Sequence, residues 1–231
     1  MTRSPRAAVG GGEVPPPETE QTWLDEGHHR IDPANLNDLR VRVMAHLADH
    51  PRVHRWLLAL AQPYLEDLVG NELAVQLRPY LSVQLPGDLD SVLALHADTW
   101  SGHSPFEIVV WVPLVDCWGT KSMYLTPPGA AGDLWERLED VDAPTTEDLF
   151  AAVEDVVRWV TVSFGEVLLF DQSLPHGNRA NLESTTQWSI NCRFTGVFIP
   201  YADKGLGDFF TPAQLRPVTM RALGLDPGTR W

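Results

Sequence analysis

The sequence is poor in cysteine and has no long apolar run. Two cysteines, Cys117 and Cys192, are too few for a disulfide framework, which indicates a reducing, cytoplasmic setting. No apolar stretch approaches the roughly 20 residues that a membrane-spanning helix needs. The first twenty residues also lack the apolar centre of a signal peptide. We therefore expect a chain that neither inserts into a membrane nor is secreted.

Basic residues are also scarce relative to acidic ones. Lys and Arg total 17 against 31 Asp and Glu, which gives a formal net charge of -14. A surface of this sign repels nucleic-acid backbones and anionic lipids, so we expect neither as a partner. The same charge would favour a cationic small-molecule substrate, although an acidic pI is also common among cytoplasmic proteins. No feature of the sequence predicts an oligomeric state.

The length and composition suit one globular domain with extensions at both ends. The chain has 231 residues, of which 44% are hydrophobic. Residues 1–22 contain runs of Gly and Pro that cannot offset the entropy of ordering, and we expect a flexible tail there. Residues 23–201 are predicted to form the single domain. Residues 202–231 are predicted to pack on it as a loop and a short helix.

The periodicity of apolar residues changes along the domain from helical to alternating. Helical spacing over 35–70, interrupted at Pro51 and Pro63, predicts two or three helices. A further helical insert is predicted over 146–159. The predicted strands cover 74–85, 91–97, 106–116, 121–126, 160–163, 166–171 and 185–198. This order predicts a mainly β fold, a double-stranded β-helix (jelly roll) over 74–198 that is braced by the N-terminal helices.

Three side chains form a candidate metal site. His96 and Asp98 are two apart at the end of a predicted strand, so both side chains point to the same face. A second apolar segment, Leu168–Phe170, runs into a turn that presents His176. Two histidines and one carboxylate are the facial triad of non-haem iron oxygenases, which leaves coordination positions open. Either piece alone is a weak signal.

A third segment strengthens the prediction. From Trp188 to Thr195 polar and apolar residues alternate strictly, so Arg193 lies on a polar face of a strand. If that face lines the interior of the barrel, Arg193 presents a fixed guanidinium beside the metal, which suits bidentate capture of a carboxylate. If the apolar face is the buried one, Arg193 faces solvent.

Together, His96-x-Asp98, His176 and, seventeen residues later, Arg193 resemble the 2-oxoglutarate and Fe(II)-dependent oxygenases. More narrowly, the runs Ser82–Asp88, His96–Glu107 and Thr120–Met123 are similar to the phytanoyl-CoA dioxygenase-like oxygenases found sporadically in carbohydrate and aminoglycoside gene clusters. The resemblance covers about residues 77–198. It implies Fe(II), 2-oxoglutarate as cosubstrate and O₂, with iron on the triad and the cosubstrate carboxylate on Arg193.

What the resemblance implies for the reaction is oxidation of a small sugar-like or aminoglycoside substrate, as in antibiotic biosynthesis or carbohydrate metabolism. Hydroxylation is the default outcome, and desaturation, epimerisation or ring closure are variants of it. Thr195, on the same strand face as Arg193, and Ser122 are further candidates for cosubstrate binding. Lys121 is a candidate carboxylate contact or a surface lysine.

The loop after the first two ligands supplies candidate substrate contacts. Trp100 could stack on a sugar ring, and His103 and Glu107 could contact an amino sugar, although tryptophans are more often core or loop anchors. Two other functions stay open at this point. One is a cupin-type isomerase or epimerase, although His96-Ala97-Asp98 stands where cupins usually carry His-x-His. The other is a non-catalytic carbohydrate-binding jelly roll, which would leave the triad without a role.

Overall fold

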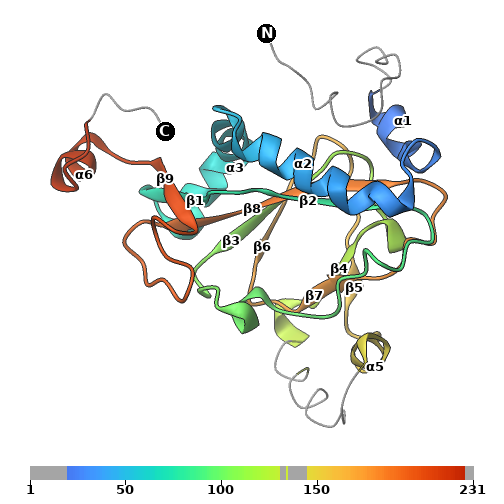
Figure 1. The fold of residues 1–231 in the computed structure, drawn as a ribbon. Helices are drawn as coiled ribbons and strands as arrows, with labels where there is room; N and C mark the ends of the chain where they lie inside the picture. Colours follow the sequence, from blue (N-terminus) through green and yellow to red (C-terminus); the bar gives the residue numbers. More distant parts are fainter. Residues whose placement is uncertain (1–19, 131–133, 135–144, 227–231) are drawn as a thin grey trace.

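Two antiparallel sheets form the framework of the protein in a computed structural model, which describes residues 20–130, 134 and 145–226 (Figure 1). One sheet has the strand order β6-β3-β8-β1-β9, with β2 also paired to β8, and the other has the order β5-β4-β7. The strands are β1 (Leu73–Gln76), β2 (Tyr80–Gln84), β3 (Ile108–Pro113), β4 (Met123–Leu125), β5 (Arg158–Trp159), β6 (Leu168–Asp171), β7 (His176–Asn178), β8 (Gln187–Gly196) and β9 (Phe210–Gln214). The fold is thus mainly β, as the sequence predicts.

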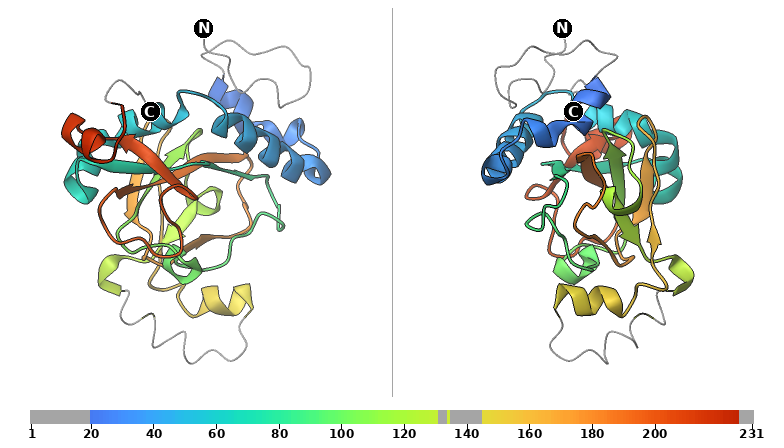
Figure 2. Two further views of the ribbon diagram at one scale, coloured as in Figure 1. Left: turned by 60° about the vertical axis from the view of Figure 1, so that its left-hand side comes forward. Right: turned by 90° about the vertical axis from the view of Figure 1, so that its right-hand side faces the viewer.

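Helices lie on the outside of these sheets. They are α1 (Glu20–Asp25), α2 (Leu36–Ala48), α3 (Val53–Val69), α5 (Thr146–Ala151) and α6 (Pro217–Ala222). Helices α2 and α3 run along the larger sheet, and α5 lies at the opposite end of the molecule (Figure 2). Leu57 and Leu65 of α3 pack against Val110 of β3 and against Cys192 and Phe194 of β8. Burial of this apolar face is what holds the helices on the sheet.

Strand β8 separates the apolar core from a polar interior. Trp188, Cys192 and Phe194 are buried in the hydrophobic clusters beneath the helices. Ser189 and Arg193, on the alternate positions of the strand, are buried as well but face a pocket between the sheets. The polar face of this strand therefore points inward, and the expectation of an Arg193 facing solvent does not hold.

Several predicted boundaries differ from the structure. Pro51 does separate α2 from α3, but α3 continues through Pro63, whose position on the exposed side leaves the freed carbonyl open to water. The segment 91–97 makes a single β-bridge, His96 to His176, instead of a strand. The helical insert is confined to α5, and 158–159 is already strand β5.

The C-terminal extension contributes more than the predicted loop and helix. Helix α6 lies there, but strand β9 pairs along β1 and so belongs to the larger sheet. At the other end, α1 begins at Glu20, within the predicted tail; the rest of that tail lies outside the described residues. Within the described ranges, no helix is long and apolar enough to cross a membrane.

Candidate metal centre

The metal-site candidates come from two segments that the backbone holds together. The main-chain N–H of His96 donates to the carbonyl of His176 at 2.9 Å, and the N–H of His176 donates back at 2.8 Å. The N–H of Asp98 donates to the carbonyl of Gln172 at 3.0 Å. The two ligand segments, eighty residues apart, are therefore joined by main-chain hydrogen bonds that do not involve the ligand side chains.

The three predicted ligand side chains converge. One ligand atom from each of His96, Asp98 and His176 lies within 4.8 Å of the others. The Nε2 atom of His96 is 3.7 Å from Oδ1 of Asp98, and the two imidazole centroids are 4.3 Å apart. Asp98 and His176 are buried, and the His96 side chain is 27% exposed. The group can hold one metal ion, with its more open side at His96.

Hydrogen bonds set the orientation of both rings. The Nδ1 atom of His96 lies 2.8 Å from the carbonyl of Ala94, and that of His176 lies 2.9 Å from the carbonyl of Leu174. A carbonyl only accepts, so Nδ1 must carry the proton in each ring. In the neutral imidazole this leaves the Nε2 lone pair for a metal, which is the usual arrangement of metal-binding histidines.

The protonation states suit a divalent cation. Burial, together with the nearby His96, lowers the pKa of His176 to about 4, so this ring is neutral at pH 7. For Asp98 burial alone would raise the pKa, but the Arg193 guanidinium and the two imidazoles outweigh it and lower the pKa. Two imidazole nitrogens and an ionised carboxylate are the donor set of the facial triad, and the residues present fit iron.

Glycine at position 177 lets the second ligand strand approach its neighbours. A Cβ atom there would lie 2.5 Å from the hydroxyl of Tyr124 and 2.8 Å from the carbonyl of Leu93. Neither distance is compatible with a side chain, because real Cβ contacts are longer. Any larger residue at 177 would push β7, and with it His176, away from the facing segment.

Arg193 lies inside this site. Its Nη2 and Nε atoms donate to Oδ2 of Asp98 at 2.6 and 3.1 Å. The Nε atom is also 3.1 Å from Oε1 of Gln172, and Nη1 is 3.2 Å from Oε1 of Gln76. The guanidinium is 5.7 Å from the ring centroid of Tyr80. The sequence predicted an arginine beside the metal but not that it would bind the metal-site carboxylate.

A pocket of about 110 Å³ opens beside the three side chains. Its lining includes the polar residues Ser82, Gln84, Ser122, Asn178, Gln187, Ser189 and Asn191. Two of these, Ser122 and Asn191, carry a buried side-chain oxygen with no hydrogen-bond partner among the described residues. Oxygen atoms buried in this way are costly unless a ligand or water binds them, so they indicate a polar occupant.

The other candidates for cosubstrate binding are placed differently. Ser122 lines the pocket, whereas Thr195 is fully buried and does not. Lys121 is also fully buried, and its ammonium lies 2.5 Å from the carboxylate of Asp25, 96 residues earlier. Lys121 therefore contacts a carboxylate, but one that belongs to helix α1.

The candidate substrate residues do not gather at the pocket. The Glu107 carboxylate is fully buried, accepts from the N–H of Ser104 at 2.8 Å and lies 2.8 Å from Nδ1 of His103. The Glu107 carboxylate is therefore already paired within its own loop, and a contact of His103 or Glu107 with substrate stays a prediction. Trp100 is 44% exposed and lies outside the pocket lining.

The structure adds residues that the sequence did not single out. Gln76 and Gln172 are almost fully buried and contact Arg193. Gln172 stands between a predicted strand and His176, but a lone glutamine has no spacing that would mark it as functional. Only the fold brings the two amides to one guanidinium.

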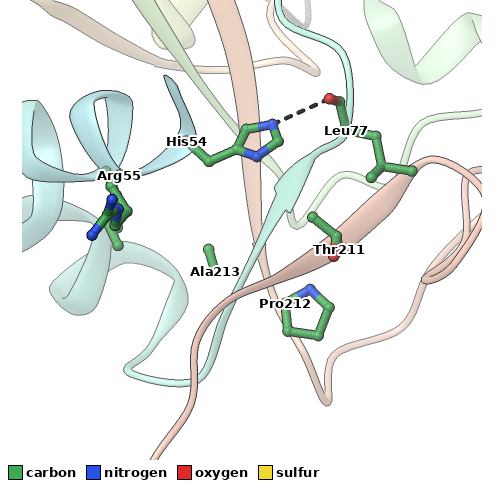
Figure 3. A pocket seen from close by; sticks show the side chains of 7 residues that line it. His54, Arg55, Leu77, Thr211, Pro212 and Ala213 are labelled. Atoms are coloured by element: carbon green, nitrogen blue, oxygen red, sulfur yellow. Dashed lines mark hydrogen bonds between the residues drawn. The ribbon is translucent and has the colours of Figure 1, made fainter. Parts of the chain in front are cut away.

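A second cavity lies apart from the metal-site candidates. It has a volume of about 240 Å³ and lies between α3 and β9, with His54, Thr211 and Pro212 in its lining (Figure 3). The His54 ring is 3.1 Å from the carbonyl of Leu77, so the ring is already bonded. No lining residue is shared with the metal-site pocket.

No protein-family model matches the chain, and neither does any curated protein. Solved structures do resemble it. HygX from Streptomyces hygroscopicus with iron bound aligns with a TM-score of 0.52 at 18% identity, over 81% of this chain and 90% of HygX. HygX with nickel and 2-oxoglutarate bound aligns with a TM-score of 0.51 at 19% identity, over 67% of this chain and 69% of HygX. These alignments establish that the chain has the fold of HygX.

Two further matches have lower scores. HygX with nickel, 2-oxoglutarate and hygromycin B bound aligns at a TM-score of 0.46 and 19% identity, over 69% of this chain and 67% of HygX. The non-haem monooxygenase ThoJ, as its nickel complex, aligns at 0.48 and 15% identity, over 79% of this chain. The chain spans 62% of the length of ThoJ.

Proposed function

We propose that the protein is an Fe(II) and 2-oxoglutarate-dependent dioxygenase that oxidises a small sugar-like or aminoglycoside substrate. The observation that carries the proposal is the convergence of His96, Asp98 and His176, each with a free ligand atom, on one point of the fold. The two sheets are, in this proposal, the walls of a double-stranded β-helix within a single domain over 23–201, to which the C-terminal extension adds strand β9. The setting is the cytoplasm, in keeping with two buried free cysteines.

The charges around the pocket favour a dianionic cosubstrate. Asp98 and Arg193 are the only charged groups among the described residues that line it, and they neutralise each other. A bound divalent cation would leave this partly buried site with two excess positive charges, which is costly unless they are paired. A dicarboxylate such as 2-oxoglutarate supplies the matching negative charge.

Arg193 retains hydrogen atoms for this cosubstrate. A guanidinium has five N–H hydrogens. The bonds to Asp98, Gln172 and Gln76 use three of them if Nε is shared between two acceptors. The two that remain, one on each Nη atom, suit a carboxylate oxygen, and the unpartnered hydroxyl of Ser122 offers a further donor from the pocket wall.

The residues of the chain divide the work of the reaction. When bound, iron, 2-oxoglutarate and O₂ together supply the oxidation of a C–H bond, with succinate and CO₂ as the products of the cosubstrate. The triad holds the ion, and the apolar lining residues Val109, Met123 and Phe170 limit water around it. The pocket is small, so a sugar must lie over the more open His96 side, where it presents the bond to be oxidised.

An amino sugar fits two observations. The net charge of -14 attracts cations, and HygX, which has the same fold, has been crystallised with hygromycin B. Trp100, half-exposed and two residues after Asp98, remains the candidate for stacking on a sugar ring.

Release of succinate is the direct test. Purified protein with Fe(II), 2-oxoglutarate and O₂ should release succinate, faster with an aminoglycoside, a nucleotide sugar or a free sugar that is its substrate. His96→Ala should lower turnover by at least about 1,000-fold, because the ion loses a ligand. His46→Ala, a histidine exposed on α2, is the matched control and should keep full turnover.

Three results would contradict the proposal. Isomerisation without 2-oxoglutarate would indicate a cupin-type enzyme. Sugar binding without any metal requirement would indicate a binding module. Succinate release that His96→Ala retains would show that the triad is not the reaction centre.

A further inference from the structure

We infer that Arg193 is a positioning residue for the metal-site carboxylate, held in place by Gln76 and Gln172, so that Asp98 offers the ion one oxygen only. This inference rests on the proposed function. It adds a role for Arg193 other than cosubstrate binding, and it assigns roles to two glutamines.

The two oxygens of Asp98 lie in different surroundings. Oδ2 accepts from Nη2 and Nε of Arg193 at 2.6 and 3.1 Å, so both donors on one edge of the guanidinium are bound to a single oxygen. Oδ1 is the oxygen that faces His96, 3.7 Å from its Nε2. To chelate an ion with both oxygens, Asp98 would have to weaken these two charge-assisted bonds, which disfavours that arrangement. Oδ1 is therefore the single ligand oxygen.

Gln76 fixes the arginine at two points. Its Oε1 atom accepts from the main-chain N–H of Arg193 at 3.1 Å and from Nη1 at 3.2 Å. Its own Nε2 donates to the carbonyl of Arg78 at 2.7 Å, so the amide cannot flip without losing bonds at both ends. Gln76 is 1% exposed.

Gln172 links the arginine to the loop behind the site. Its Oε1 lies 3.1 Å from Nε of Arg193, and its Nε2 donates to the carbonyl of Ser104 at 2.7 Å. Its main-chain carbonyl accepts from the N–H of Asp98. Gln172 thus contacts Asp98 directly through the backbone and indirectly through Arg193. Both glutamines are buried, and every polar atom of their side chains has a partner, as a positioning role requires.

Metal affinity tests the inference without turnover. Gln172→Met and Gln76→Met each remove an amide that accepts a hydrogen bond from Arg193, while the charges of Arg193 and Asp98 stay in place. Partners of this kind, one shell outside the ligands, typically change metal affinity by about 10–100-fold. We expect the Kd for Co(II), measured by calorimetry on the full chain, to rise by that factor in each variant. The visible absorption of bound Co(II) should also change, because a released carboxylate can coordinate through both oxygens.

Gln84→Met is the matched control. Gln84 is 1% exposed and lines the same pocket, but its amide donates to the carbonyls of Ser91 and Arg179 instead of contacting Arg193. Its Kd for Co(II) should stay within about 3-fold of the unaltered protein. Circular dichroism identifies the variants that fold. If either Gln172→Met or Gln76→Met does not fold, the measurement on the other variant is sufficient.

The outcomes separate the inference from the proposed function. A folded Gln172→Met or Gln76→Met protein that binds Co(II) as tightly as the unaltered chain, with the same spectrum, overturns the inference alone. Equal weakening of Co(II) binding by Gln84→Met also overturns it. Failure of the unaltered chain to bind one Co(II) overturns the proposed function itself.

Discussion

Lys121 shows what a charged side chain does in this fold when it does not line the pocket. It is fully buried, 2.5 Å from Asp25 of helix α1, and its ammonium lies 4.5 Å from the ring centroid of Trp118. The sequence allowed either a carboxylate contact or a surface position for it. The carboxylate contact is observed, but its partner, Asp25, is 96 residues away along the chain and has no spacing that would predict it.

Removing the partner of Lys121 should destabilise the fold. Asp25→Ala leaves the buried Lys121 ammonium without its carboxylate partner, and breaking a buried pair costs about 3–5 kcal/mol. Since Asp25 is 23% exposed, we expect a smaller loss of unfolding free energy, about 2 kcal/mol. Urea denaturation followed by tryptophan fluorescence measures it.

Glu26→Ala provides the comparison for Asp25. Glu26 pairs with Arg30 at 2.9 Å, but both side chains are at least one-third exposed, and such pairs contribute at most about 1 kcal/mol. If Asp25→Ala costs no more than Glu26→Ala, water reaches Lys121 and the pair is not a buried one. Asp25→Ala combined with Lys121→Met should recover most of the loss.

At the level of elements, strand β9 ties the C-terminal part to the domain. Phe210, fully buried on β9, packs with Ala74 of β1 and with Val197. Phe210→Ala should lower the unfolding free energy by about 3–5 kcal/mol, since it leaves a cavity in this small cluster. The same urea titration provides the measurement.

Val218→Ala is the control for Phe210→Ala, because Val218 belongs to the same extension but is 75% exposed. It should change stability by less than about 0.5 kcal/mol. Equal effects of the two substitutions would mean that β9 contributes no core.

Elements with strong local patterns were predictable, and those that depend on partners were not. The helical spacing of α2 and α3 follows from burial of one face, and the alternation of β8 follows from an apolar face and a polar face; the sequence displays both patterns directly. Strand β9 contains Pro212 and lies among Pro and Gly residues, so its pairing with β1 has no local signal. Segment 91–97 has residues typical of a strand, but it forms only one β-bridge, between His96 and His176.

The candidate site divides in the same way. His96, Asp98 and His176 are marked by residue type and by their places after predicted strands, and the structure brings them together. Strand periodicity puts Arg193 on a polar face, but only the structure shows that this face points inward. Its bond to Asp98 and its two glutamine supports come from three separate segments, so no spacing along the chain predicts them.

For the molecule as a whole, an ion bound only by the folded state should raise its thermal stability. Ni(II) at about a hundred times its Kd adds about 2.7 kcal/mol to the unfolding free energy. For a chain of this size that raises the Tm by roughly 5–10 °C. Differential scanning calorimetry on metal-free protein with and without Ni(II) measures the shift.

His176→Ala should reduce the rise in Tm caused by Ni(II) to about 1 °C or less. His46→Ala should show the same rise in Tm as the unaltered protein. An equal shift in all three proteins would place the bound ion elsewhere on the acidic surface.

The reciprocal main-chain bonds between His96 and His176 have a practical consequence for protein engineering. Because these bonds use no side-chain atom, they can persist when either histidine is substituted. Cysteine, glutamate or alanine could replace either histidine on an unaltered frame. The chain thus offers a scaffold in which coordination chemistry can be redesigned one donor at a time, for instance to leave a coordination position open to a halide.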